Sequence, residues 1–221
     1  MSQHTLTLLR FTYKKLKEKL KEKLTVSDSK KLFHEQFPYV IPGLYKRLVD
    51  EMIVELNLLN HQNEFKQDDL FCLGLTETFK ELTKGYEPGA HLVLLFDSLC
   101  NSSNFEPSKI KDISKKTLKK YKEKSLKEIS ILLKEKITSN LYSSRILNIG
   151  IYLIIANATD FKEIKDSEKN KAISDIIKNL NLSVNKAEKD ISIYKSSIKK
   201  MEQARELLQE AIIQNKKKNN K

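Results

Sequence analysis

The sequence predicts an all-α protein, a compact multi-helix bundle followed by one long C-terminal coiled-coil helix. Three observations lead to this prediction. Apolar residues recur at spacings of three and four along most of the 221 residues, which is the period of one helix face. Gly and Pro number only five and four, whereas a β-rich fold needs many turn residues. The segment after residue 181 contains neither Gly nor Pro and keeps a heptad pattern.

Composition sets bounds on the core and on the surface. The chain is 39% hydrophobic, which is enough for one core of moderate size. Its formal net charge of +12 favours anionic partners, namely nucleic acid, anionic lipid or an acidic protein. The longest apolar run covers residues 146–158, and two Asn residues interrupt it. Because a spanning helix needs ~20 residues, we expect no transmembrane helix, and the N-terminus predicts no signal peptide.

Residues 1–24 are expected to form a basic N-terminal extension, followed by a helical body over residues 25–180. One apolar stripe runs along the extension, formed by Leu16, Leu20 and Leu24. The first helix of the body is expected to start at a cap on Ser27 or Asp28, and Pro38 ends it.

The next helix follows Pro42, which suits the first turn of a helix. It has the strongest amphipathic pattern in the first half of the chain, because its apolar residues recur at helical spacing. These residues are Leu44, Tyr45, Leu48, Val49, Met52, Ile53, Leu56 and Leu59. A polar loop over residues 60–67 separates this helix from the one that follows.

Two further helices are expected before residue 101. Asp68 is a suitable N-cap for a helix over residues 70–84. Gly85 then stands where a residue in the left-handed conformation commonly ends a helix. A shorter helix is expected over residues 91–100.

The segment 109–136 is rich in lysine but keeps one mostly apolar face, and Ser125 marks a break within it. Two more helices are expected over residues 142–159 and 167–180. The lysine face is either an ordinary solvated helix face or a basic surface for an anionic membrane, an acidic partner or nucleic acid. Aromatic residues are not interleaved with the lysines, so the sequence predicts no specific nucleic-acid site.

The last element, residues 181–214, is expected to be a coiled-coil helix. Its a and d positions are Val184, Ala187, Ile191, Tyr194, Ile198, Met201, Arg205, Leu208 and Ile212, with Arg205 as the one break. A helix of about 30 residues is roughly 45 Å long, so it should project, pair with another helix or fold back along the body. Residues 215–221 are expected to be a disordered basic tail.

The sequence contains no recognisable catalytic or metal-binding motif. The histidines lack metal-ligand spacing: His4, His34, His61 and His91. Cys72 and Cys100 lie within apolar helical patterns and fit small core residues. Helix capping and surface ion pairs account for the neighbouring carboxylates, which are Asp68, Asp69, Glu51 and Glu55. We therefore expect a protein that is not an enzyme and that binds no cofactor and no metal ion.

An ordered series of residues between Thr25 and about residue 160 resembles a known family. The first group is Thr25, Val26, Ser27, Asp28, Lys30, Phe33, Ile41, Pro42, Tyr45, Arg47, Val49, Glu51, Val54, Glu55, Leu56, Leu58 and Leu59. The second group is Phe65, Phe71, Leu73, Gly74, Leu75, Phe79, Gly85, Tyr86, Pro88 and residues 96–100. The third group is Tyr142, Ser143, Arg145, Ile149, Gly150 and Tyr152. In this order they resemble the thylakoid-formation family, also described as photosystem II biogenesis proteins, of cyanobacteria and plastids.

The resemblance implies an all-helical, non-enzymatic protein with a C-terminal coiled-coil helix. It implies a role in thylakoid membrane organisation and in photosystem II assembly and repair. The implied partners are FtsH-type membrane proteases and photosystem II components, and the implied place is the cytoplasmic side of the thylakoid membrane, bound peripherally. The candidate protein-contact residues are Tyr45, Arg47, Glu51, Gly85, Tyr86 and Arg145, together with the coiled-coil positions.

Two other functions remain compatible with the residues. A basic helical protein that binds nucleic acid would account for the net charge of +12. A coiled-coil scaffold that only self-associates would account for the heptads. The resemblance favours a non-enzymatic role in photosystem II assembly and repair over both of these functions.

Overall fold

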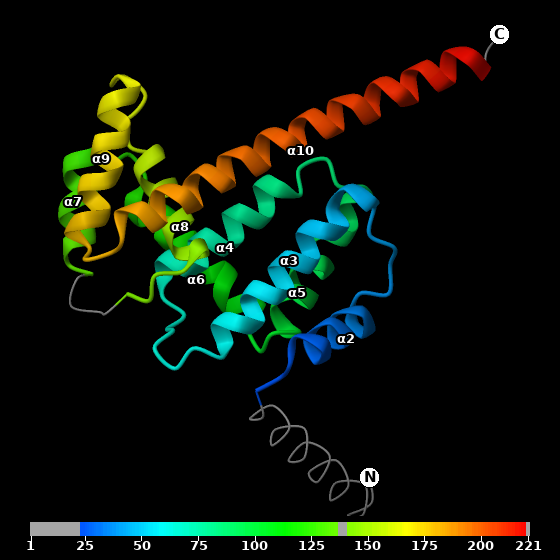
Figure 1. The fold of residues 1–221 in the computed structure, drawn as a ribbon, viewed down its shortest axis with the longest axis horizontal. Coiled ribbons are helices and arrows are strands. Elements are labelled where there is room, and N and C mark those ends of the chain that lie inside the picture. The colour runs from blue at the N-terminus through cyan, green and yellow to red at the C-terminus, as the bar shows by residue number, and fades with distance from the viewer. Residues whose placement is uncertain (1–22, 137–140, 220–221) are drawn as a thin grey trace, which may run out of the picture.

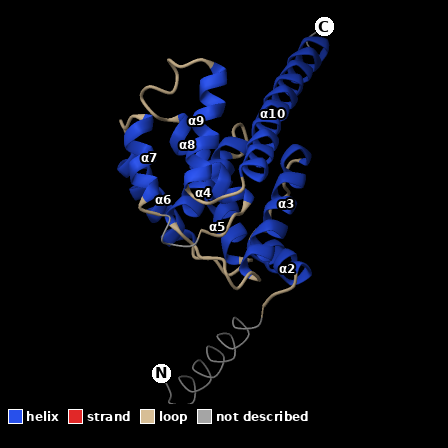
Figure 2. Cartoon of the chain, turned by 60° about the vertical axis from the view of Figure 1, so that its left-hand side comes forward, coloured by secondary structure: helices blue, strands red, loops and turns tan. Residues whose placement is uncertain are grey.

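The computed structural model describes residues 23–136 and 141–219, and every regular element in this part of the chain is a helix (Figures 1 and 2). The prediction of an all-α fold is confirmed. Nearly all of the predicted N-terminal extension, 1–24, lies outside the described residues. The elements are α2 (Val26–Gln36), α3 (Gly43–Asn60), α4 (Asp69–Leu82), the 3₁₀ helix η1 (Gly89–His91), α5 (Leu92–Asn101), α6 (Pro107–Tyr121), α7 (Leu126–Lys134), α8 (Arg145–Ala156), α9 (Asp166–Asn179) and α10 (Val184–Asn219).

Helix α4 lies at the centre of the body, and its most extensive contacts are with α8 and α6. The crossing of α4 and α8 is built on two glycines, Gly74 and Gly150. A Cβ atom on Gly74 would lie 2.1 Å from the carbonyl oxygen of Ile146, and one on Gly150 would lie 2.1 Å from that of Leu70. The two backbones are therefore in direct contact, and no larger residue fits at either position.

Three predicted helix boundaries are confirmed. The carboxylate of Asp68 accepts a hydrogen bond of 2.7 Å from the N–H of Phe71 and so caps α4. Gly85 has a φ of 73°, the left-handed conformation expected after this helix. Ser125 ends the loop between α6 and α7, and with Glu128 it forms a capping box at the start of α7.

The first predicted cap is wrong by a few residues. Thr25, not Ser27 or Asp28, is the N-cap of α2. Its hydroxyl accepts a hydrogen bond of 3.2 Å from the N–H of Asp28, and the Asp28 carboxylate accepts one of 3.1 Å from the N–H of Thr25. This reciprocal pair needs Ser or Thr followed three residues later by an acidic side chain, a spacing that the sequence does contain.

The lysine-rich helices α6 and α7 are amphipathic. Helix α6 buries one face against α4 with the residues Ile110, Ser114, Thr117 and Tyr121. The opposite faces are exposed to solvent and carry Lys109, Lys115, Lys116, Lys119, Lys120, Lys127 and Lys134. In this part of the chain the lysines therefore lie on a solvated face over an ordinary core.

Helix α10 is 36 residues long and has two different surroundings. Its first half packs on α8, α9 and α4. Its second half extends past the other helices to the C-terminal end of the described chain (Figure 1). The helix continues to Asn219, so residues 215–219, expected as part of a disordered tail, are helical in the structure.

Candidate functional site

The candidate contact residues fall in three places on the body. Arg47 and Glu51 form an exposed ion pair of 2.8 Å on the outer face of α3. Tyr45, Gly85 and Tyr86 lie together at the turn after α4. Arg145 lies in a groove between α3 and α8. These residues share one family motif series in the sequence, but in the structure they lie in three different environments.

Two side chains, one from α3 and one from α10, donate hydrogen bonds to the same backbone carbonyl in the turn after α4. The hydroxyl of Tyr45 donates a hydrogen bond of 3.0 Å to the carbonyl oxygen of Lys84. The guanidinium of Arg205, from α10, donates a second bond of 2.6 Å to the same oxygen. The rings of Tyr45 and Tyr86 pack with their centroids 5.1 Å apart. Arg205, the one break in the heptads, is therefore the residue that ties α10 to this turn.

Gly85 sits directly under the Arg205 side chain. A Cβ atom on Gly85 would lie 2.9 Å from Cδ of Arg205, and the positive φ already disfavours any other residue. Tyr45 and Tyr86 are almost fully buried, and this burial raises the pKa of both phenols. Their side chains therefore support the turn from inside the body, and Arg205 and Gly85 form its outer surface.

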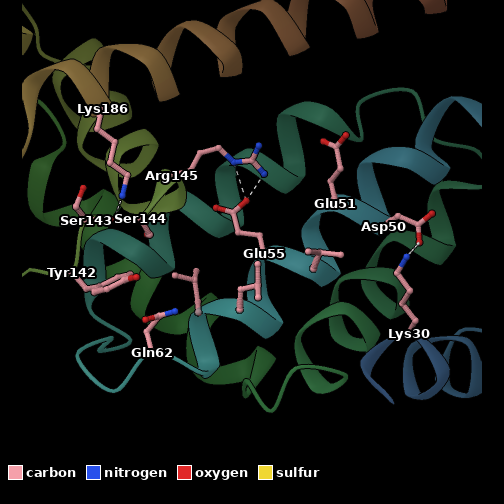
Figure 3. Close-up of a pocket in the computed structure, with 13 residues that line it drawn as sticks. Lys30, Asp50, Glu51, Glu55, Gln62, Tyr142, Ser143, Ser144, Arg145 and Lys186 are labelled. Atoms are coloured by element: carbon pink, nitrogen blue, oxygen red, sulfur yellow. Dashed lines mark hydrogen bonds and ion pairs between the residues drawn. The ribbon is translucent and has the colours of Figure 1, made fainter. Parts of the chain in front are cut away.

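The groove beside α3 has a volume of about 610 Å³ (Figure 3). Its apolar floor is formed by Val54, Leu58 and Leu59 of α3. Its rim is polar, and it is lined by Lys30, Asp50, Glu51, Glu55, Gln62, Tyr142, Ser143, Ser144, Arg145 and Lys186. A site with an apolar floor and a charged rim has the make-up of a protein-contact surface.

The ion pair between Arg145 and Glu55 forms the inner wall of this groove. Nε of Arg145 donates a hydrogen bond of 2.9 Å to Glu55, and Nη2 donates a second bond to the same carboxylate oxygen (Figure 3). Both side chains are partly or largely shielded from solvent. Burial raises the pKa of the Glu55 carboxyl, and the charge and hydrogen bonds of Arg145 offset part of that rise. The pair links α8 to α3 across 90 residues of sequence.

The other cations of the rim also have partners. Nζ of Lys186, from the first turn of α10, donates a hydrogen bond to the carbonyl oxygen of Ser143. Lys30 of α2 lies 3.4 Å from the carboxylate of Asp50 on α3. These contacts connect α2, α3, α8 and α10 around the groove, and they neutralise much of its charge.

The described residues offer little for catalysis. Over residues 23–136 and 141–219, no three His, Cys, Asp or Glu side chains are placed to hold a metal ion together. Both cysteines are free and buried, and burial raises the pKa of the Cys72 thiol to about 11, so it is protonated and a poor nucleophile at neutral pH. Among the helices in those same ranges, none combines the length and the hydropathy needed to cross a bilayer.

The heptad positions of α10 divide at Arg205. Before it, the a and d side chains face the body: Ala187, Ile191 and Tyr194 are buried, and Val184, Ile198 and Met201 are half-buried. After it, Leu208 is 51% exposed, and the side chain of Ile212 lies outside the described part of the structure. Most of the predicted seam is therefore filled by α4, α8 and α9 of the same chain.

The distal half of α10, residues 206–219, exposes large apolar side chains that the heptad analysis only partly identified. Leu207 is 66% exposed, and Leu208 and Ile213 are also exposed. Leu207 and Ile213 are not heptad positions, so the heptad pattern does not predict that they are exposed. The sequence also does not predict Glu55 as the partner of Arg145, because its i, i+4 spacing from Glu51 is typical of a surface position.

Comparisons with known proteins agree with the fold and with the motif series. The profile of the family described as "Thylakoid formation protein" matches residues 25–221. The chain is 82% identical to Protein Thf1 of Prochlorococcus marinus subsp. pastoris over 91% of this chain and 100% of that protein. It is 71% identical to Protein Thf1 of Prochlorococcus marinus strain MIT 9312, over 90% and 99% of the two chains. A solved structure of Psb29 at 1.55 Å superposes with a TM-score of 0.77 at 25% identity, over 90% of this chain and all of that one.

Proposed function

Because this chain belongs to the thylakoid formation protein family, we propose that it is a non-enzymatic accessory factor that binds an FtsH-type membrane protease during photosystem II assembly and repair. It acts at the cytoplasmic side of the thylakoid membrane, attached peripherally. It stabilises or regulates the protease through its binding surface, without a reactive group of its own.

The observation that carries this proposal is the distal half of α10. A helix that served only the body would end near Arg205, which donates a hydrogen bond to the turn after α4. Instead it continues for several turns with Leu207, Leu208 and Ile213 exposed. Exposed apolar side chains on a projecting helix are suited to docking in a partner's groove.

The groove beside α3 supplies a second contact region on the same chain. Glu51, the ion-pair partner of Arg47, lines it on α3, and Arg145 forms its inner wall. A protein partner that reached both the groove and the distal half of α10 would cover the exposed members of the candidate contact set. The buried tyrosines would then act indirectly, by holding the turn to which Arg205 binds.

A deletion that spares the body tests the proposal. Removing residues 207–221 takes away the exposed apolar side chains but keeps Arg205 and every heptad position that packs on the body. In pull-downs from detergent-solubilised thylakoid membranes, we expect the full chain to recover FtsH subunits, and the deletion to lower recovery by about tenfold. Failure of the full chain to recover any FtsH subunit or photosystem II component overturns the proposal.

A matched pair of point variants separates a specific contact from a loss of helix length. Leu207→Ser with Leu208→Ser removes two exposed apolar side chains, and Gln203→Ser with Gln209→Ser alters exposed polar ones on the same helix. Recovery should fall for the leucine pair only. Equal recovery by both variants would show that the apolar side chains are not the contact.

The same exposed side chains also suit pairing with a second copy of the chain, which is the principal alternative. Sedimentation velocity of the full chain and of the chain lacking residues 207–221 distinguishes the two. A dimer that becomes a monomer on deletion favours the scaffold, and a monomer in both cases favours the accessory factor. Binding to nucleic acid would instead follow the exposed lysines of α6 and α7, with a steep dependence on salt.

A further inference from the structure

Four exposed apolar side chains gather at one end of the body, where the α2–α3 connection meets the start of α5. Val40 is 93% exposed, Val93 is 64% exposed, and Tyr39 and Leu94 are also exposed. They belong to the α2–α3 connection and to the start of α5, which lie on the same side of the molecule in Figure 1. We call residues 38–42 and 88–94 the loop patch.

Aromatic stacking joins the two loops into one surface. The rings of Tyr39 and His91 are stacked with centroids 3.9 Å apart and an interplanar angle of 19°. Phe37, which is buried in the core, contacts both rings from below, with centroids 5.5 Å from Tyr39 and 6.2 Å from His91. The exposed aliphatic side chains are thus held on a fixed base, and their ordering on binding requires little further loss of conformational freedom.

The loop patch projects outward and is not a groove. A side chain that is 93% exposed, as Val40 is, stands clear of its neighbours and offers no concave surface to a partner side chain. None of residues 38–42 and 88–94 lines the groove beside α3. Projecting aliphatic side chains with aromatic rings behind them are the arrangement by which peripheral proteins enter the boundary region of a bilayer.

The charges around the loop patch favour an anionic bilayer. Lys46 is exposed in the first turn of α3, directly after the α2–α3 connection, and Arg47 beside it is paired with Glu51. Glu87, the acidic residue at the edge of the second loop, turns back to accept a hydrogen bond of 3.2 Å from the N–H of Gly89. The whole chain carries a formal net charge of +12. Basic residues beside a small apolar tip add electrostatic attraction to lipid phosphates.

We propose that the loop patch is a membrane-docking surface, in which Val40, Val93 and Leu94 enter an anionic lipid bilayer at the level of the headgroups. Tyr39 and His91 lie at the interface, and Lys46 faces the lipid phosphates. This surface would make the peripheral attachment named in the proposed function, on which the inference rests. Its binding to lipid requires no protease. Purified components therefore test it separately from any pull-down.

Vesicle sedimentation with the purified full-length chain provides the test. We expect binding to vesicles containing phosphatidylglycerol and much weaker binding to pure phosphatidylcholine. Val40→Asp with Val93→Asp should lower the partition coefficient on the anionic vesicles by about tenfold or more, because two charges replace two inserting side chains. Leu208→Asp, on the distal half of α10, is the matched control and should leave it unchanged.

Fluorescence gives a local readout that is independent of affinity. Because Cys72 and Cys100 are buried, a polarity-sensitive thiol dye should label Val40→Cys selectively. Its emission should shift to the blue on adding anionic vesicles, and that of Leu208→Cys should not. The proposal is overturned if the full-length chain does not bind anionic vesicles, or if the aspartate variant binds them as well as the unaltered chain. It is also overturned if that variant loses only its recovery of proteins, because the patch would then contact a protein.

Discussion

The two halves of α10 carry the same heptad pattern in different surroundings. In the proximal half, Val184–Arg205, the pattern is occupied by the protein's own helices, and Ala187, Ile191 and Tyr194 are buried. In the distal half, residues 206–219, Leu208 stands exposed at the next position of the same pattern. The comparison shows that heptad spacing predicts a helix with an apolar stripe, and that the length of the body decides which part of the stripe is left for a partner.

The largest expected effect contrasts one residue from each half. Ile191→Ala should lower the free energy of unfolding by about 3 kcal/mol, because it leaves a cavity between α10 and the body. Leu208→Ala should change it by less than about 0.5 kcal/mol, because that side chain is already exposed. Urea unfolding followed by circular dichroism measures both. Similar losses for the two variants would show that the distal half is also packed in solution.

The second prediction concerns α8, the helix on which the proximal half rests. Arg145→Ala should lower the free energy of unfolding by about 2 kcal/mol, because it leaves the Glu55 carboxylate shielded and unpaired. This is less than for a fully buried pair, since about a third of the Arg145 side chain is exposed. Arg47→Ala, which breaks an exposed pair on α3, should change it by less than about 0.5 kcal/mol. Equal values in urea unfolding would mean that the inner pair is fully screened by water.

The third prediction tests the boundary between the two halves, where Arg205 meets Gly85. Gly85→Ala should lower the free energy of unfolding by about 1–2 kcal/mol, because a φ of 73° disfavours alanine and the new methyl group meets Arg205. Gly43→Ala is the matched control, because a Cβ there meets no atom within 4 Å. Thermal unfolding of both variants checks this, and a melting temperature for Gly85→Ala equal to that of the unaltered chain would contradict it.

The smallest expected effect depends on pH and acts on α4, which the proximal half also contacts. Burial raises the pKa of Asp68 from 3.8 to about 6, the hydrogen bond from Phe71 opposes this, and the nearby Asp69 adds to it. A raised pKa means that the folded state binds the proton more tightly, so this contribution to stability is complete below pH 4 and is lost as pH rises through 6. Asp68→Asn keeps a capping oxygen without the charge. It should therefore be more stable than the unaltered chain by about 1 kcal/mol at pH 8.

The control for that prediction is to compare the same two proteins at low pH. Below about pH 4 the unaltered Asp68 is protonated, so the difference from Asp68→Asn should vanish. Asp68→Ala should instead be destabilised at both pH values, because it removes the N-cap. A stability difference for Asp68→Asn that is the same at pH 4 and pH 8 would contradict the assigned cause.

The sequence predicts the local features of the fold well, because each has a cause within a few residues. Asp68 caps α4, Gly85 follows it in the left-handed conformation, and Ser125 starts α7. The capping box at Thr25 was equally readable, since it needs only a hydroxyl and a carboxylate three residues apart.

The candidate site could be predicted only in part, because its contacts are long-range. Arg145 and Glu55 are 90 residues apart, and Arg205 lies 121 residues from the carbonyl that it binds. No periodicity in the chain indicates such pairs. Tyr45 is a motif residue that also belongs to the apolar face of its helix, and the fold shows that its side chain is buried. No sequence pattern predicts the loop patch, because its members belong to the α2–α3 connection and to the start of α5, which are about 50 residues apart.

The close contact at Gly74 and Gly150 couples the positions of α4 and α8, because their backbones touch directly. Any side chain at either position would push α8 away from α4. Arg145 on α8 would then move relative to Glu55, and Asn148, which donates a hydrogen bond of 2.8 Å to Asp190 of α10, would move with it. The crossing of α4 and α8 therefore helps to set the direction of α10, and mutations at Gly74 or Gly150 should redirect its distal end while leaving the side chains of that end unchanged.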